Sequence, residues 1–199
     1  MNIYNDKEIL ITGGTGSFGN EFCRKITVNK IKPRRLIIYS RDEFKQEEMQ
    51  KKFPENKFPF IRFFIGDIRD KERLYRAMEN IEIVIHSAAL KHVNLAEVNP
   101  KQTVENNVIG SLNIIKASIR AQVPLTVGIS TDKACNPDST YGYTKKLMEQ
   151  VFSEYHSSET KFVCTRFANV AKSNGSVIPY WLSENEKGQP KQDDCWKIV

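Results

Sequence analysis

The sequence predicts an α/β fold in which helices cover both faces of a parallel β-sheet. Short runs rich in β-branched and aromatic residues recur along its 199 residues, and longer segments with helical periodicity separate them. A glycine-rich turn follows the first of these runs, where a parallel sheet of this kind passes from its first strand into its first helix. Together these observations predict repeated strand–helix units around one sheet.

Six strands and five helices are expected in alternation. The strands are expected at 8–12, 36–40, 61–65, 81–86, 123–130 and 161–166. The helices are expected at about 17–28, 42–52, 70–79, 99–121 and 139–155. In the fourth helix, Val104, Val108, Leu112, Ile115 and Ile119 recur at helical spacing, which indicates packing against the core.

The chain is long enough for one domain with a sizeable core. We expect residues 1–182 to form this domain and to carry the catalytic residues. Residues 183–199 are polar, include Pro190 and show no convincing strand or helix. This tail is interpreted as loosely ordered or dependent on a partner, and as the remnant of a substrate-binding region.

Composition excludes several classes of protein. Hydrophobic residues make up 40% and charged residues 27%, as in soluble globular proteins. The net charge is +6, but basic residues are dispersed among acidic ones, so anionic small molecules are expected as partners rather than nucleic acid. No secretion signal or apolar run of about 20 residues occurs, so a cytoplasmic protein without membrane contact is expected.

The four cysteines show no metal-ligand spacing. Cys23, Cys135, Cys164 and Cys195 lie far apart in the sequence. We expect reduced, mostly buried thiols and no metal site.

The segment Thr12-Gly-Gly-Thr-Gly-Ser-Phe-Gly19 has glycines at 13, 16 and 19. Glycine lets the backbone turn sharply and approach a pyrophosphate, and the start of the next helix directs unpaired N–H groups at the anion. An ordinary turn is the alternative, but the position between strand and helix favours a doubly wound, Rossmann-type sheet that binds a dinucleotide. The contacts expected from this turn are Gly13, Thr15, Gly16, Ser17, Phe18 and Gly19.

The end of the second strand favours NADP over NAD. An acidic residue there bonds the ribose hydroxyls of NAD, whereas a cation accommodates the additional phosphate of NADP. Here Ser40, Arg41 and Lys45 occupy this region. The alternative is that Arg41 pairs on the surface with Asp42 or Glu43.

Two residues after the third strand are also expected near the cofactor. Asp67 could accept a hydrogen bond from the adenine amino group, and Ile68 follows it. The alternative is that Asp67 or Asp70 caps the next helix.

Tyr141 and Lys145 are four residues apart and so share one helix face. An ammonium beside a tyrosine lowers its pKa and allows it to act as a base near neutral pH. Tyr143 has no such partner, because residue 147 is leucine. Such pairs are usually structural, but the position after a late strand, downstream of a dinucleotide turn, favours catalysis.

At this point the chain resembles the extended short-chain dehydrogenases/reductases, and within them the 4,6-dehydratases that act on UDP-N-acetylglucosamine. The resemblance spans nearly all of residues 7–182. It is carried by the glycine turn at 12–19, Tyr-Ser-Arg-Asp-Glu at 39–43, Ala-Ala-Leu-Lys-His-Val at 88–93, Ser-Thr-Asp-Lys-Ala at 130–134, Tyr141 with Lys145, and Arg-Phe-Ala-Asn at 166–169.

The resemblance implies an internal redox cycle on the sugar. Tyr141 would deprotonate the 4-hydroxyl while NADP takes the C4 hydride, and Lys145 would assist Tyr141. Lys133 would remove the C5 proton, Asp132 would protonate the departing 6-hydroxyl, and the hydride would return to C6. Thr131 would orient the substrate near the 4-hydroxyl. Related enzymes that retain the C5 configuration have methionine where this chain has Tyr141, which favours C5 inversion.

The resemblance also implies further contacts and partners. Ala88, Ala89 and Lys91 would lie at the cofactor, and Lys91 and Asn169 would also line the sugar pocket; a loop-capping amide is the alternative for Asn169. The substrate would be UDP-N-acetylglucosamine or a related nucleotide sugar in glycan biosynthesis. A homo-oligomer is expected through helices 99–121 and 139–155. The small C-terminal substrate domain of such enzymes is expected to be largely missing here.

Three functions stay open on the sequence. The first is an active nucleotide-sugar 4,6-dehydratase, because Asp132, Lys133, Tyr141 and Lys145 are all present. The second is an inactive NADP-binding module. The third is a sugar-nucleotide epimerase or reductase of the same superfamily, for which the Asp132-Lys133 pair would be superfluous.

Overall fold

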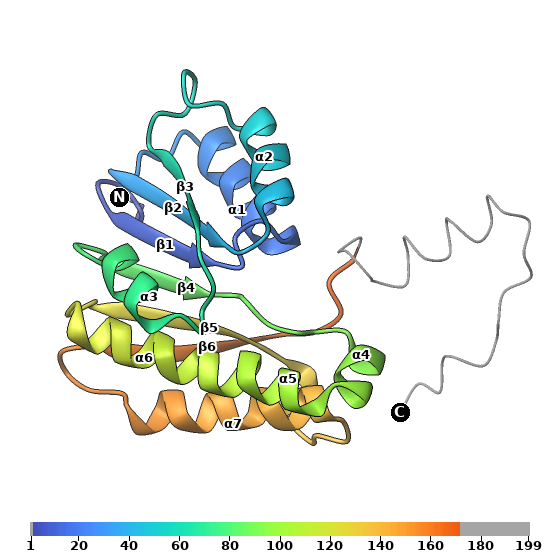
Figure 1. Cartoon of the computed structure of the whole chain (residues 1–199). Helices are drawn as coiled ribbons and strands as arrows, with labels where there is room; N and C mark the ends of the chain where they lie inside the picture. The colour runs from blue at the N-terminus through green and yellow to red at the C-terminus, as the bar shows by residue number, and fades with distance from the viewer. Residues whose placement is uncertain (1, 172–199) are drawn as a thin grey trace, which may run out of the picture. The chain divides into compact units, whose positions relative to one another are not determined.

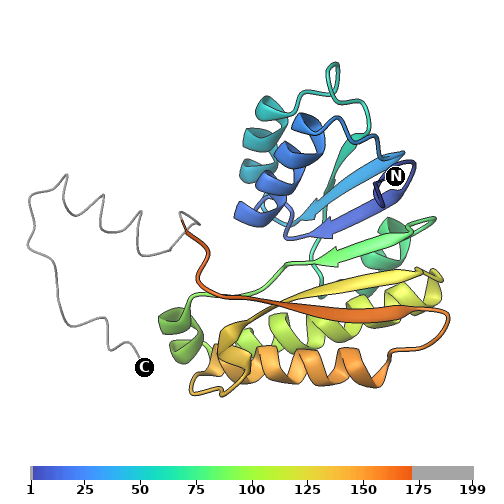
Figure 2. The same ribbon diagram turned by 180° about the vertical axis from the view of Figure 1, so that it is seen from behind.

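The computed structural model describes residues 2–171 and shows a six-stranded sheet with helices on both faces (Figures 1 and 2). All strand pairs are parallel, and the order is β3-β2-β1-β4-β5-β6. The strands are β1 Glu8–Thr12, β2 Arg35–Ser40, β3 Ile61–Ile65, β4 Ile83–His86, β5 Leu125–Thr131 and β6 Lys161–Phe167. The sheet therefore winds outward in both directions from β1 and β4, which confirms the predicted Rossmann-type fold.

The helices form a layer on each face of the sheet. Helices α1 (Ser17–Val28) and α2 (Glu43–Lys52) cover one face, and α3 (Lys71–Ala77), α6 (Gly110–Arg120) and α7 (Thr140–Glu154) cover the other (Figures 1 and 2). The strands and helices belong to one compact unit, Met1–Phe167. Because parallel strands are buried on both faces, their sequences are apolar runs rather than alternating ones.

Side chains of β1 show how the core is divided. Ile9 and Ile11 pack with Cys23 of α1 and Met49 of α2. Leu10, which points to the opposite face, packs in a second cluster with α3 and α6. A third cluster joins Phe152 of α7 to β6.

The helix expected at 99–121 is interrupted. It consists of α5 (Pro100–Val104), a π-helical turn at Glu105–Ile109 and α6. The extra residue of a π turn rotates the helix face, so a stripe extended through it does not stay on one side. Val104 and Ile119 are accordingly 42% and 44% exposed, and the prediction that they pack in the core was wrong.

A short helix, α4 (Val93–Val98), and a 3₁₀ turn at Asp132–Ala134 were not predicted. Among the described cysteines Cys23 is buried, but Cys135 and Cys164 are exposed, which corrects the expectation of mostly buried thiols. Within residues 2–171, no His, Cys, Asp and Glu side chains gather as a metal site, and no helix could cross a membrane. The polar tail at 183–199, its boundary after residue 182 and Cys195 lie outside the described residues.

Candidate functional site

Two glycines of the turn after β1 are required by the close approach of other backbone atoms. Gly13 has φ +64°, in the left-handed region, and a Cβ there would lie 2.8 Å from the Ala88 Cα. A Cβ on Gly19 would lie 1.9 Å from the Gly14 carbonyl oxygen. The turn therefore packs on the segment that follows β4 and back onto itself.

The start of α1 is suited to an anion. Its N-cap residue is Gly16, which provides no side-chain cap, and no acidic residue lies in the first turn. Backbone N–H groups at the start of a helix lack intrahelical partners and carry partial positive charge. Ser17 and Phe18 lie in this first turn, so the predicted pyrophosphate cradle has the required chemistry.

Side chains hold the turn in place. The Thr15 and Ser40 hydroxyls lie 2.9 Å apart and are buried, so two predicted cofactor residues contact one another. Asn20 donates to the carbonyls of Thr15 and Gly16 at 3.0 Å. Asn20 was missed by the sequence analysis, because nothing in its local pattern distinguishes it from a surface residue of α1.

His86 forms a second support beneath the turn. Its Nδ1 lies 2.7 Å from the Thr12 hydroxyl and its Nε2 lies 3.0 Å from the Ser111 hydroxyl. Complete burial, with Lys145 as a smaller cause, lowers its pKa to about 3, so the imidazole is neutral. This network ties the ends of β1 and β4 to α6, and it too was missed.

Arg41 lies just beyond β2, and its side chain is 56% exposed. It pairs with Asp67 at 3.6 Å. The alternative, a surface pair with Asp42 or Glu43, was therefore wrong. Lys45 instead pairs with Asp42, the N-cap residue of α2, at 3.0 Å. Both cations are exposed, and the ion pair of Arg41 is the longer of the two.

Asp67 is held by Arg69, whose Nη2 donates to it at 2.6 Å. This bond outweighs burial and lowers the Asp67 pKa to about 2. The cap of α3 is Asp70, which accepts from the Arg73 N–H at 3.0 Å, so the capping alternative holds for Asp70 and not Asp67. Ile68 is 4% exposed and packs in the core, so only its backbone could meet a cofactor.

The loop after β4 is held by Asn107 of the π-helical turn. Asn107 accepts from the Leu90 N–H at 2.8 Å, donates to the Leu90 carbonyl at 3.0 Å and donates to Thr144 of α7 at 3.1 Å. Ala88 and Ala89 are half-buried in this loop and Lys91 is exposed. Partial burial nevertheless lowers the Lys91 pKa.

The end of β5 brings together three predicted catalytic residues. The Thr131 hydroxyl donates to Asp132 Oδ1 at 2.8 Å, and Lys133 Nζ lies 3.3 Å from the same oxygen. Burial raises the Asp132 pKa, but the hydrogen bonds from Thr131 and Lys133 outweigh it and leave the pKa below its usual value. The Asp132 and Lys133 side chains are 49% and 38% exposed, so both reach solvent.

Tyr141 and Lys145 lie on α7, as predicted, but they do not form the expected electrostatic pair. Burial raises the Tyr141 pKa, and a hydrogen bond with Thr131 only partly offsets this. Lys145 is 3% exposed, and its Nζ donates to the Ile129 carbonyl at 2.7 Å. Burial lowers the Lys145 pKa to about 8.

Glu97 of α4 holds the start of α7. Its carboxylate accepts from the Thr140 N–H at 2.6 Å and from the Thr140 hydroxyl at 2.9 Å, next to Tyr141. The sequence carries no local signal for this contact across 43 residues. Asn169 belongs to the second unit, Ala168–Val199, and not to the compact unit that carries the other predicted residues.

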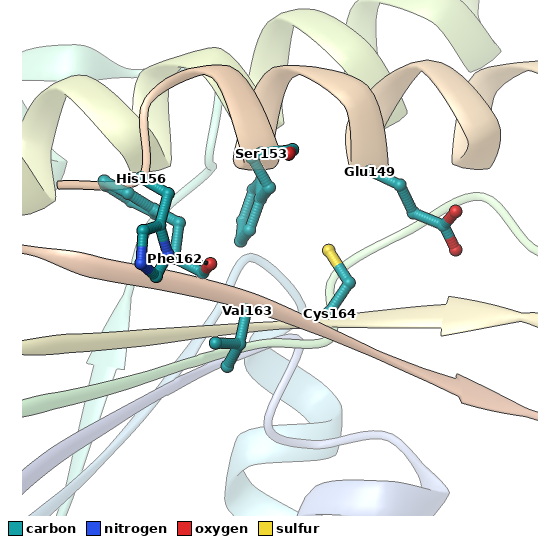
Figure 3. A pocket seen from close by; sticks show the side chains of 7 residues that line it. Glu149, Ser153, His156, Phe162, Val163 and Cys164 are labelled. Atoms are coloured by element: carbon teal, nitrogen blue, oxygen red, sulfur yellow. Dashed lines mark hydrogen bonds between the residues drawn. The ribbon is translucent and has the colours of Figure 1, made fainter.

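A surface groove runs between α7 and β6 (Figure 3). It is lined by Glu149, Phe152, Ser153, His156, Phe162, Val163 and Cys164. The groove contains none of the predicted cofactor or catalytic residues.

The parallel sheet, the glycine turn between β1 and α1, and the Tyr141–Lys145 helix after β5 define a Rossmann-fold protein of the short-chain dehydrogenase/reductase class. Residues 9–191 match the family described as polysaccharide biosynthesis protein, and the chain belongs to this family.

Curated relatives that match this chain include a dehydratase and an epimerase. A UDP-N-acetylglucosamine 4,6-dehydratase (inverting) from Campylobacter jejuni is 45% identical over 198 residues, which cover 96% of this chain and 58% of the relative. A UDP-glucose 4-epimerase from Rickettsia canadensis is 39% identical over 195 residues, which cover 94% of this chain and 56% of the relative. The chain thus spans somewhat more than half the length of these relatives.

Solved structures share the fold. Pen from Bacillus thuringiensis is 39% identical with a TM-score of 0.88, and the match covers 94% of this chain and 59% of that one. A dTDP-glucose 4,6-dehydratase from Streptomyces venezuelae, with NAD bound, is 24% identical with a TM-score of 0.80, and the match covers 91% and 62%. The second likeness concerns the fold alone.

Proposed function

We propose that this chain provides the dinucleotide-binding and catalytic part of a nucleotide-sugar 4,6-dehydratase that acts on UDP-N-acetylglucosamine. The observation that carries the proposal is the cluster of Thr131, Asp132 and Lys133 at the carboxyl end of β5, with Tyr141 on the next helix. Carboxyl ends of parallel strands meet at one edge of the sheet, which is also the edge of the glycine turn. The dehydratase relative supports the same reaction class.

Each residue of the cluster has a role in this reaction. A bound nicotinamide supplies the acceptor, and later the donor, of one hydride. Tyr141 takes the proton of the sugar 4-hydroxyl, and the Thr131 hydroxyl beside it orients that group. Lys133 removes the C5 proton, which is acidic next to a C4 ketone, and a proton is returned to C5 from the opposite face after the hydride has reached C6. Asp132 is ionised at rest because its pKa lies below its usual value, so it takes up a proton from solvent before it gives one to the departing 6-hydroxyl.

The reaction can be tested by incubating the purified chain with UDP-N-acetylglucosamine and NADP in deuterium oxide. We expect NMR to show a 6-methyl signal and deuterium at an inverted C5. Tyr141→Phe should reduce turnover by about 100-fold or more, because it removes the general base. Tyr143→Phe is the matched control, since Tyr143 lies on the same helix but is 59% exposed. An unchanged sugar beside demonstrable dinucleotide binding would instead support the inactive module.

For the cofactor we propose a nicotinamide dinucleotide, with NADP favoured over NAD. The turn fits the group because a Cβ at Gly13 would meet the Ala88 backbone and because the start of α1 lacks a side-chain cap. Arg41 favours NADP, since its exposed guanidinium can contact the additional phosphate. The Streptomyces venezuelae structure has NAD bound, so binding of both cofactors to this chain should be measured.

Isothermal titration with each cofactor tests this preference. Arg41→Ala should weaken NADP binding by about tenfold and leave NAD binding nearly unchanged, because one charge-assisted contact is lost. Arg24→Ala is the control, since Arg24 pairs with Glu21 on the exposed side of α1. Tighter binding of NAD than of NADP by the unaltered chain would contradict the preference.

A second candidate function is a nucleotide-sugar epimerase, which the Rickettsia relative favours. Release of a C4 epimer without a 6-deoxy product would identify it. In that case Lys133→Met should leave turnover intact, whereas the dehydratase requires Lys133 as a base.

We also propose that the chain assembles with copies of itself. Four large apolar side chains on α4 and α7 support this, because they are exposed to solvent. They are Leu95, Val98, Tyr143 and Leu147, at 61%, 73%, 59% and 43% exposure. A monomer at micromolar concentration in analytical ultracentrifugation would contradict assembly.

A further inference from the structure

Helix α7 continues its catalytic face one turn beyond Lys145. Tyr141, Lys145 and Glu149 follow one another at intervals of four residues and therefore lie in one row. The Glu149 side chain is only 12% exposed, and Lys145 is 3% exposed. Leu147, between them in sequence, is 43% exposed, so the row faces the sheet and the intervening residue faces outward.

Arg166 of β6 forms a bidentate ion pair with Glu149. Its Nε donates to Glu149 Oε1 at 2.8 Å and its Nη2 donates to Oε2 at 2.7 Å. Its Nη1 also lies 3.1 Å from the Cys135 sulfur, just after the turn that carries Asp132 and Lys133. A bidentate pair of this kind fixes orientation as well as charge. It joins the active-site helix to the edge strand (Figure 3 shows Glu149 on α7 above β6).

The space beneath this pair is polar. The Ser130 hydroxyl of β5 is buried close enough to Glu149 to lower its pKa, after the larger effect of Arg166, yet it meets hydrogen-bond geometry with no described residue. Lys145 donates to the carbonyl of the preceding residue, Ile129.

Few charges surround the Lys145 ammonium. From β4 it faces His86, which is neutral; from β6 it faces Cys164, whose pKa burial raises to about 11. From α7 the charge of Glu149 acts on it, and from β5 the Ile129 carbonyl accepts its hydrogen bond. At neutral pH Glu149 is therefore the anion that acts on Lys145 within the described residues.

We propose that Glu149 and Arg166 form a positioning pair for Lys145: the carboxylate balances the buried ammonium one turn away on the same face of α7, and the bidentate guanidinium holds the carboxylate on that face. The proposal rests on the proposed function only in that Lys145 lies on the same helix face as Tyr141, the proposed base. Its consequence is that the protonation of Lys145 depends on an ion pair outside the proposed catalytic cluster.

The direct test is NMR titration of protein carrying ¹³C-labelled lysine, with the Lys145 signal assigned by its loss in Lys145→Met. Glu149→Gln should lower the Lys145 pKa by about half a unit or more, because the balancing charge is removed. Arg166→Met should lower it by less than Glu149→Gln does, because the carboxylate keeps its charge and loses only the partner that holds it in place. Glu149→Asp should retain most of the native value and so guards against a trivial folding defect.

The control is Glu154→Gln, which removes an exposed carboxylate from the same helix and should leave Lys145 unaffected. Equal pKa values in Glu149→Gln and the unaltered chain, or equal downward shifts in Glu149→Gln and Arg166→Met, would overturn the proposal. Turnover gives a separate readout, in which the alkaline limb of the kcat profile should move to lower pH in Glu149→Gln with KM unchanged. Absence of turnover in the unaltered chain would remove the proposed function, while the titration would still decide this inference.

Discussion

The glycine turn after β1 and the underside of α7 build the same site by different means. At the turn, geometry is set by backbone atoms, because Gly13 and Gly19 lie where a Cβ would strike main chain. Beneath α7, geometry is set by buried polar side chains, because Lys145 and Glu149 are held by partners from β5 and β6. The stability of the first region should therefore depend on the volume of its side chains. The stability of the second should depend on the charge of its side chains and on pH.

The largest expected effect tests the backbone half of this comparison. Gly19→Ala should destabilise the fold by about 3 kcal/mol or more and abolish dinucleotide binding, because its Cβ would lie 1.9 Å from the Gly14 carbonyl oxygen. Urea unfolding and isothermal titration measure the two losses. Gly16→Ala is the matched control, since Gly16 has φ −73° and its nearest atom would be 3.2 Å away. Similar losses of unfolding free energy in both variants would break the comparison.

An intermediate effect tests the charge half through Lys145. Its pKa is about 8 in the fold and 10.5 as the reference value, so between these limits the unfolded chain binds more protons than the native one. The penalty for burying the ammonium is present below pH 8 and disappears as pH rises to about 10.5. The unfolding free energy of the unaltered chain, relative to Lys145→Met, should rise over this window by up to about 3 kcal/mol.

Urea unfolding of both proteins at several pH values between 7 and 10.5 measures that difference. Subtracting Lys145→Met cancels the contribution of other groups that titrate in the same window. A flat difference would mean that Lys145 is solvated in solution and that the second region does not depend on buried charge.

The smallest effect concerns Asp67, a partly exposed carboxylate beside the cofactor region. Its pKa is lowered to about 2 from 3.8, chiefly by Arg69, so it stabilises the fold above pH 4 and this contribution is lost as pH falls toward 2. Asp67→Asn should cost about 1 kcal/mol at pH 7, after allowance for solvent screening, and much less at pH 2.5. Thermal unfolding at the two pH values is the measurement, and a pH-independent loss would assign the effect to packing.

Several elements could be predicted because their signals are local. Strands β1 and β3 and helix α1 agree with the expected bounds, since apolar runs, glycine turns and helical spacing act over a few residues. Helix α4 was missed because six residues offer too little periodicity. The π-helical turn in the 99–121 helix was missed because its extra residue leaves no mark in composition.

The sequence by itself determined the strand–helix order, the turn that suits a dinucleotide, and the spacing that places Tyr141 and Lys145 on one helix face. Only the tertiary structure decided what these residues contact: Arg41 meets Asp67, Glu97 holds the start of α7, and Lys145 donates to Ile129. The physical reason is the distance along the sequence over which each kind of interaction acts. Backbone preference and periodicity are properties of neighbouring residues, whereas burial and charge balance depend on side chains that folding brings together from distant positions.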